Sequence, residues 1–397
     1  MNAKADPLRW RVFAMAVTTA ITIANVYYCQ PILSKISDTL GATDAQIGNL
    51  PVLTQVGVGM GLLFLAPLGD MLDRKKLVIC LELLLVCALL GMSVANTLAT
   101  VYAASFAIGV FAVAVQIVVP MAASMATAET KGKIVGTVFT GTLTGILVSR
   151  IASGYLADWL GWRSVYIVSA ALVFGVSLLI LAAFPSQPGR HQGSYGGLMA
   201  STLSQFFRFA KLRRLSLLGA LIFGAFCSFW TTLTFHLSMA PFSFDSSQIG
   251  LFGFVAIAGT LFAPFFGRLA DRSSPERMQT LTIFLMILGV LCGQWWQNST
   301  IALIAATLLL DIGVQATQVN NLAQIYKLDE TAHSRINSVF MVCFFIGGAI
   351  GSYCGVWAWS AGGWPFVSGQ LLAFSVFALL VSILNLSASK RPSAPHI

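Results

Sequence analysis

Charged residues are scarce in this chain. Asp, Glu, Lys and Arg together make up 9% of its 397 residues, whereas apolar residues make up 57%. Because a soluble domain carries roughly 25% charged residues, the composition excludes an ordinary soluble protein. It indicates a chain that folds within a lipid bilayer.

The sequence also lacks the residue groupings that enzymes and metalloproteins use. It has four histidines, and three of them, His191, His333 and His396, lie in predicted loops or tails. Its seven cysteines all fall within apolar stretches, with no spacing that suits a metal or a disulfide framework. No segment has the nucleotide-binding form G-x-x-x-x-G-K-S/T. We therefore expect no enzyme activity, no metal site and no cofactor.

Twelve long apolar stretches dominate the chain. A transmembrane helix needs about 20 mostly apolar residues, and continuous runs of this length exclude the alternating strands of a membrane barrel. The sequence therefore predicts an all-α membrane protein with twelve transmembrane helices. The predicted spans are 12–33, 47–70, 77–96, 101–126, 133–157, 163–184, 215–239, 247–270, 278–297, 300–325, 335–358 and 364–386.

The placement of the basic residues gives the orientation. The net charge of +9 would suggest nucleic-acid binding in a soluble protein, but here the charge lies in alternate loops. Of the 23 Lys and Arg residues, all but Lys35, Arg150 and Arg163 fall on the side of the N-terminus. Positive loops stay in the cytoplasm, so we expect both termini there, membrane lipids as neighbours and no nucleic-acid partner.

A polar break divides the chain near its middle. Residues 186–194 are polar and glycine-rich, and residues 203–214 alternate aromatic with basic side chains. This alternation is typical of an amphipathic helix on the membrane surface. We predict a six-helix bundle over 1–185, a cytoplasmic linker with an amphipathic helix over 186–214, and a second six-helix bundle over 215–397.

A short polar signature occurs twice, about two hundred residues apart. Residues 66–76 read APLGDMLDRKK and residues 267–272 read GRLADR. Lys133 and Arg335 keep the same separation, as do Gly161-Trp162 and Gly363-Trp364. Internal similarity at this scale in a membrane protein is typical of a transporter built from two related halves.

These segments resemble the major facilitator superfamily, whose loop motif has the form G-x-L-x-D-R-x-G-R-R/K. The first copy matches at Asp70, Arg74 and Lys75, with Ala66 and Asp73 where glycines are usual. The second copy matches at Gly267, Asp271 and Arg272. The resemblance implies two six-helix bundles, alternating access to a central cavity, and a monomer.

Three further segments are similar to the drug–proton antiporter branch of this superfamily, which includes arabinose-efflux-type permeases. They read NVYYCQP at 25–31, GILVSR at 145–150 and DIGVQ at 311–315. One departure is that the fourth span, around Ser105 and Phe106, lacks the arginine that many proton antiporters carry there.

Asp311 is the main candidate for proton coupling. An ionisable side chain within the bilayer costs roughly 2.5–3.5 kcal/mol, so it is a functional hypothesis by default. Thr307, Asp311, Gln315 and Gln318 share one face of the tenth span. We expect Asp311 to bind and release a proton; the alternative is a structural hydrogen-bond hub.

Arg150 and Glu82 are the other ionisable residues within predicted spans. Arginine does not deprotonate in proteins, so we expect Arg150 to act in proton coupling as a counter-charge to Asp311; a structural anchor is the alternative. Glu82 lies close to Lys76 along the third span. We therefore expect it to reach toward the membrane surface.

The substrate site is expected on spans 1, 4, 7 and 10, which the resemblance places around the central cavity. Amides and aromatic rings suit an amphiphilic organic molecule. The alternative is that these side chains bond within their own helices or gather at the interface. The candidates are Asn25, Tyr28, Gln30, Gln116, Trp230, Thr234, Gln315 and Gln318.

The repeated charged loops are candidate gates. The resemblance implies that Asp70 docks near the start of the eleventh span and Asp271 near the start of the fifth. A helix N-terminus attracts an acid by typically 0.3–1 kcal/mol, so such contacts would hold the cytoplasmic side closed. The gating candidates are Asp70, Arg74, Lys75, Asp271, Arg272 and Arg335.

Glycines at four-residue spacing mark spans five and eleven, at Gly141 and Gly145 and at Gly347 and Gly351. Small residues on one face allow close approach of helices. We expect the tight, sliding interface that is used in rocking; ordinary helix packing is the alternative.

Together these features predict a secondary active transporter of the inner membrane that exports a small organic or amphiphilic compound, such as a drug-like molecule, a sugar or a metabolite, by proton antiport. One alternative is a proton-coupled uptake symporter or a facilitator on the same fold. A second is a membrane sensor that does not transport.

Overall fold

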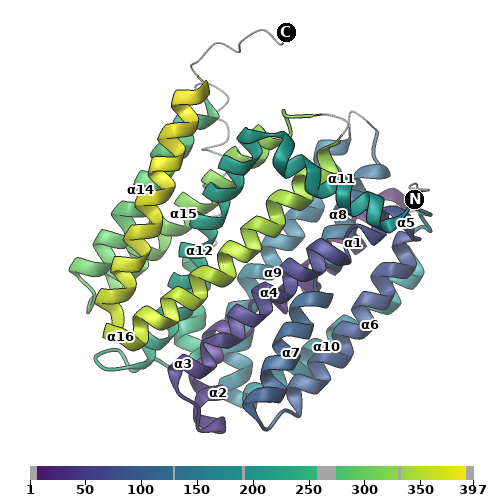
Figure 1. The fold of residues 1–397 in the computed structure, drawn as a ribbon. Coiled ribbons are helices and arrows are strands. Elements are labelled where there is room, and N and C mark those ends of the chain that lie inside the picture. The colour runs from purple at the N-terminus through teal and green to yellow at the C-terminus, as the bar shows by residue number, and fades with distance from the viewer. Residues whose placement is uncertain (1–6, 128–129, 190–192, 257–273, 330–331, 390–397) are drawn as a thin grey trace, which may run out of the picture. The chain divides into compact units, whose positions relative to one another are not determined.

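The computed structural model describes residues 7–127, 130–189, 193–256, 274–329 and 332–389 (Figure 1). Helices and the turns between them account for these residues, and no strand occurs among them. The all-α class predicted from the composition is confirmed.

The first half of the chain folds into ten α-helices and one short 3-10 helix. Their bounds are α1 Pro7–Ala24, η1 Gln30–Ile32, α2 Leu33–Leu40, α3 Asp44–Ile47, α4 Asn49–Phe64, α5 Leu68–Met71, α6 Arg74–Ser93, α7 Leu98–Phe111, α8 Ala114–Ser124, α9 Lys131–Leu160 and α10 Trp162–Ala183.

The second half contains longer helices. Their bounds are α11 Tyr195–Arg208, α12 Ala210–Ser238, α14 Pro275–Trp295, α15 Thr300–Ile325 and α16 His333–Ser389, with a further apolar helix over Ser246–Ala256. The amphipathic helix expected over 203–214 is divided: residues up to 208 belong to α11, and α12 begins at Ala210.

Nine helices in the described part of the chain are long and apolar enough to cross a membrane. The last of them, Arg335–Ser387, passes through a kink at Gly363, whose φ of 64° favours glycine, and so contains two of the expected spans. The helix α1 overlaps the first expected span, 12–33, but ends at Ala24, and Ser246–Ala256 begins the eighth.

The chain divides into two compact units. The first comprises Met1–Met199 with Leu237–Gly253, and the second comprises Ala200–His236 with Phe254–Ile397. The segment Leu237–Gly253, which the sequence assigns to the second bundle, thus packs within the first unit.

The two units use matching helix pairs. In the first unit α1 packs on α9, and α6 packs on α7 and α10; in the second unit α14 packs on α15 and on α16. Because α6 and α14 are the third helices of the two predicted bundles, the same neighbours recur in both. The packing therefore repeats as the sequence signatures do.

Close backbone contacts occur at equivalent places in the two units. A Cβ atom on Gly141 or Gly145 of α9 would overlap the backbone of Ala16 or Ala20 of α1. A Cβ atom on Gly347 or Gly351 of α16 would likewise overlap the backbone of α12. These contacts lie inside each unit, as the ordinary-packing alternative expects.

The substitution Gly145→Ala should destabilise the protein by about 1–3 kcal/mol, because its methyl group would meet the carbonyl oxygen of Ala20. The matched control is Gly136→Ala on the same helix, where a Cβ meets nothing within 4 Å. Alanine favours a helix over glycine by up to about 1 kcal/mol, so the control should keep or raise the melting temperature of the purified protein. Equal shifts for both variants would contradict the packing described here.

Candidate functional site

The chain leaves α-helical geometry directly after α1. Residues 25–29 form turns before η1, in which Pro31 supplies no amide hydrogen. A 3-10 bond from the amide of Ile32 to the carbonyl of Cys29, at 3.2 Å, continues the chain instead. Gln30 is the first residue of η1, and it is 1% exposed.

Gln30 receives a hydrogen bond from Arg150 of α9. The Nε atom of Arg150 donates to Oε1 of Gln30 at 3.0 Å, across 120 residues of sequence. The guanidinium carbon lies 5.3 Å from the centroid of the Tyr27 ring. A planar guanidinium suits both contacts at once, so two sequence-predicted site residues, Gln30 and Arg150, meet inside the first unit.

The remaining candidates of the first unit lie near the same helices. Asn25 donates to the carbonyl of Ile21 at 2.9 Å and accepts a 2.6 Å bond from the Ser169 hydroxyl of α10. Tyr28 is buried, and Gln116 is half-buried just after the break between α7 and α8. A substrate role for these three residues stays a prediction.

In the second unit the structure brings together Asp311 and Trp230. The indole Nε1 of Trp230, on α12, donates to Oδ1 of Asp311, on α15, at 3.3 Å. Both side chains are buried, and the rings of Phe226 and Phe229 lie 6.3 and 6.2 Å from the Trp230 ring. The acid expected to couple protons therefore lies beside an aromatic cluster.

Three further candidates lie on the same two helices as this pair. Thr234 donates to the Trp230 carbonyl at 3.3 Å, one turn back on its own helix. Gln318 donates to the sulfur of Met341 at 3.9 Å, and Gln315 is half-buried on α15. Their contact with substrate also stays a prediction.

The expectation for Glu82 is wrong. Its side chain is fully buried rather than extended to the membrane surface, and its Oε1 accepts a 2.6 Å bond from the Thr22 hydroxyl of α1. The sequence placed it by distance from Lys76, but the face of α6 that carries Glu82 points into the unit. This buried acid is absent from the sequence-predicted site.

The charge cluster of the first repeated loop is organised locally. Arg74 donates to Asp70 at 3.0 Å and to the carbonyl of Gly69 at 2.9 Å, and Lys75 donates to the carbonyl of Leu181 at 2.8 Å. In the second unit, Arg335 donates to the Ser201 hydroxyl of α11 at 2.6 Å. Asp271 and Arg272 lie outside the described residues, so the gating contacts stay a prediction.

Asp73, which stands where the motif usually has glycine, caps the N-terminus of α6. It accepts a 3.0 Å bond from the amide of Lys76 and a second bond from the Ser186 hydroxyl. Burial raises the pKa of this carboxyl, but the hydrogen bonds lower it by more than burial raises it. The pKa of Asp73 therefore lies below the ordinary value. The departure from the motif therefore has a capping role.

A second charged cluster lies at the other end of the first unit. The amine of Lys35 pairs with Asp158 of α9 at 2.5 Å, and Asp158 also accepts a 2.7 Å bond from the amide of Ser247. The Ser247 amide belongs to the first turn of the helix Ser246–Ala256, where free amides attract an acid. Asp158 thus joins α9 to the segment Leu237–Gly253.

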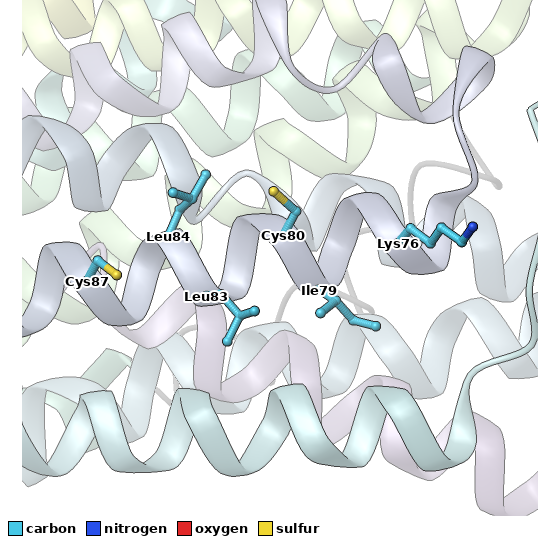
Figure 2. Close-up of a pocket in the computed structure, with 6 residues that line it drawn as sticks. All are labelled: Lys76, Ile79, Cys80, Leu83, Leu84 and Cys87. Atoms are coloured by element: carbon cyan, nitrogen blue, oxygen red, sulfur yellow. The ribbon is translucent and has the colours of Figure 1, made fainter.

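A shallow groove runs along the exposed face of α6 (Figure 2). Leu83 and Leu84 are 43% and 41% exposed, and no sequence-predicted site residue lines the groove. An apolar face of this kind on a membrane-crossing helix suits contact with lipid tails. The lining residues are Lys76, Ile79, Cys80, Leu83, Leu84 and Cys87.

Comparisons with known proteins agree on one family. The profile of the Major Facilitator Superfamily matches residues 15–245 and 215–396. The uncharacterized transporter YgaY of Escherichia coli O157:H7 is 35% identical over 369 residues, which cover 93% of each chain. The "Probable transporter SCO4007" of Streptomyces coelicolor is 30% identical over 377 residues, covering 92% of this chain and 86% of its own.

A solved structure of the nucleoside transporter NupG superposes with a TM-score of 0.78. The superposition covers 96% of this chain and all of that one, at 12% sequence identity. At this identity the likeness shows the fold alone, and it confirms the fold expected from the sequence.

The substitution Arg150→Lys should destabilise the protein by about 1.5–3 kcal/mol, the usual worth of a hydrogen bond to a charged group. An ammonium cannot keep the Gln30 bond and the Tyr27 stacking together. The exposed Arg277 gives a matched control as Arg277→Lys. A thermal melt of each purified variant checks the difference, and an Arg150→Lys melt equal to that of wild type would refute the anchoring contacts.

Proposed function

The chain belongs to the major facilitator superfamily, and we propose that it exports a small organic or amphiphilic compound in exchange for protons. Transport across the inner membrane by a multi-pass protein, rather than enzyme chemistry, is its function. The outward direction, the proton coupling and the class of compound are the parts that we propose.

Asp311 carries the proposal. It lies within the 26-residue helix α15, is 2% exposed, and has the Trp230 indole as a hydrogen-bond donor. An acid held in hydrocarbon is costly unless it binds a proton or finds a counter-charge. An acid that alternates between these two states can couple proton movement to a change of conformation.

The surroundings of Asp311 support an amphiphilic substrate. The rings of Phe226, Phe229 and Trp230 supply apolar and quadrupolar surface, which binds flat or cationic organic molecules. Gln315 and Gln318 on α15 supply amides that can orient such a molecule. Competition between a proton and the substrate near one acid is the simplest route to exchange.

Arg150 is proposed as the counter-charge. Its guanidinium keeps a fixed positive charge at any cellular pH, and its contacts with Gln30 and Tyr27 hold it near the break after α1. In the proposed cycle it pairs with Asp311 when that acid is ionised. We also propose that both termini lie on the cytoplasmic side and that the cluster around Asp70 and Arg74 closes this side.

The substitution Asp311→Asn should abolish substrate movement driven by a pH gradient but preserve substrate binding, because a fixed amide cannot titrate. Everted membrane vesicles energised with a pH gradient, with the fluorescent cation ethidium as first probe, measure this. A thermal-shift panel of organic cations, sugars and metabolites selects further substrates.

Asp38→Asn is the control, since it makes the same chemical change at an exposed acid on α2. Undiminished gradient-driven flux in Asp311→Asn would exclude Asp311 as the proton carrier. Accumulation that requires the gradient in the opposite direction would instead indicate an uptake symporter.

A further inference from the structure

The proposed cycle makes no use of Glu82, although this acid lies deep in the first unit. It is the ninth of the 20 residues of α6, and so about 12 Å along a helix of about 30 Å. The helix buries one face, which carries Val78, Glu82, Leu85 and Leu89. The groove of Figure 2 lies on its exposed face.

The carboxyl side chain of Glu82 has a single hydrogen bond in the described part of the chain. Its Oε1 accepts the 2.6 Å bond from Thr22, and its Oε2 is buried without a hydrogen-bond partner among the described residues. None of the ion pairs between described residues includes Glu82. An ionised carboxylate in this position would carry an uncompensated charge, at a high cost in free energy.

The charged and titratable groups on the helices around α6 have other partners. On α10, Arg163 donates to the Ala95 carbonyl and the Asn96 side chain, and the Tyr166 ring packs on Trp162. Tyr102 of α7 donates to the Gln46 carbonyl, and Asp70 of α5 pairs with Arg74.

The other packed elements bring no charge to Glu82 either. The helix α8 has no titratable residue, and Arg9 and Arg11 of α1 precede Thr22 by eleven residues or more, which is about 16 Å of helix. On α6 itself, Lys75 donates to the Leu181 carbonyl, and Lys76 lines the groove on the exposed face.

We infer that Glu82 is a second proton-binding site of the transporter, located in the first unit. In the described conformation the proton sits on Oε2, while the Thr22 hydroxyl donates to Oε1. When α1 moves away from α6 and water enters, the Oε2–H bond breaks and the proton passes to water, leaving a solvated carboxylate. This inference rests on the proposed proton coupling and adds a site to it.

The position of Thr22 links this site to the rest of the unit. Thr22 lies one turn before the break that carries Tyr27 and Gln30, and those two residues hold Arg150. A change at Arg150 that displaces the end of α1 would therefore also displace the Thr22 hydroxyl, which donates to Glu82. Proton release at Glu82 can follow events at Arg150 in this way.

Infrared spectra of the full-length protein in lipid vesicles test the site without any substrate. At neutral pH the wild type should show the carbonyl stretch of a protonated carboxyl, and Glu82→Gln should lose it. Glu276→Gln is the matched control, because Glu276 is also buried but pairs with Lys211 at 3.0 Å. A band that survives unchanged in Glu82→Gln would overturn the inference.

The folding of the variant is checked separately. Glutamine has the shape of a neutral glutamic acid and can accept from Thr22, so the melting temperature should stay within about 4 °C of wild type. If Glu82→Gln does not fold, Thr22→Val in the otherwise native chain gives the test. Loss of the hydroxyl should raise the carbonyl frequency, whereas Thr18→Val, whose hydroxyl donates to the Ala14 carbonyl, should not; an unshifted band in Thr22→Val would overturn the inference.

The same spectra separate this inference from the proposed function. Loss of the band in Asp311→Asn and not in Glu82→Gln would overturn the Glu82 site and leave coupling at Asp311 standing. Loss in Glu82→Gln, with no gradient-driven flux of ethidium or the panel compounds, would leave the Glu82 site standing and overturn proton-coupled export.

Discussion

An ionisable side chain inside the bilayer is costly unless the protein supplies a partner or the group is neutralised, because hydrocarbon supplies no hydrogen bonds. Three ionisable residues meet this constraint differently. Arg150 uses the Gln30 amide and the Tyr27 ring, Asp311 has the Trp230 indole, and Glu82 has the Thr22 hydroxyl. Tyr27 and Gln30 both lie in the break after α1, and both contact the same guanidinium. The positions of the functional groups thus follow from the cost of burying them.

Close backbone packing holds the helices that carry these donors. The first helix of each half, α1 or α12, contacts a glycine face on the fifth helix of its own half, at Gly145 or Gly351. Backbone-to-backbone contact resists lateral separation better than the meeting of long flexible side chains. The polar residues of α1 and α12 can therefore change partners while the helices stay attached to their own unit.

The sequence alone predicts the fold well and the site in part. Long apolar runs suffice to predict an all-helical membrane protein, because a backbone in lipid must satisfy its own hydrogen bonds. Asp311 and Trp230 are chosen as candidates for their side-chain chemistry, and the structure brings them into contact. The burial of Glu82 cannot be predicted from the sequence, because α6 is apolar on both faces and its pattern does not show which face is buried. The Gln30–Arg150 contact depends on side-chain geometry after a helix break, which no spacing rule supplies.

The two buried acids share one further feature. Glu82 receives its donor from α1, and Asp311 receives its donor from α12, the equivalent first helix of the second unit. The donors differ in kind, a hydroxyl and an indole, and the acids lie on different helices of their halves, α6 and α15. The two donors lie on equivalent helices, whereas the two acids do not. What is repeated in the two halves is therefore a hydrogen bond from the first helix to a buried acid. A small shift of a first helix would then change the surroundings of an acid in either half, as the two proposed proton sites require.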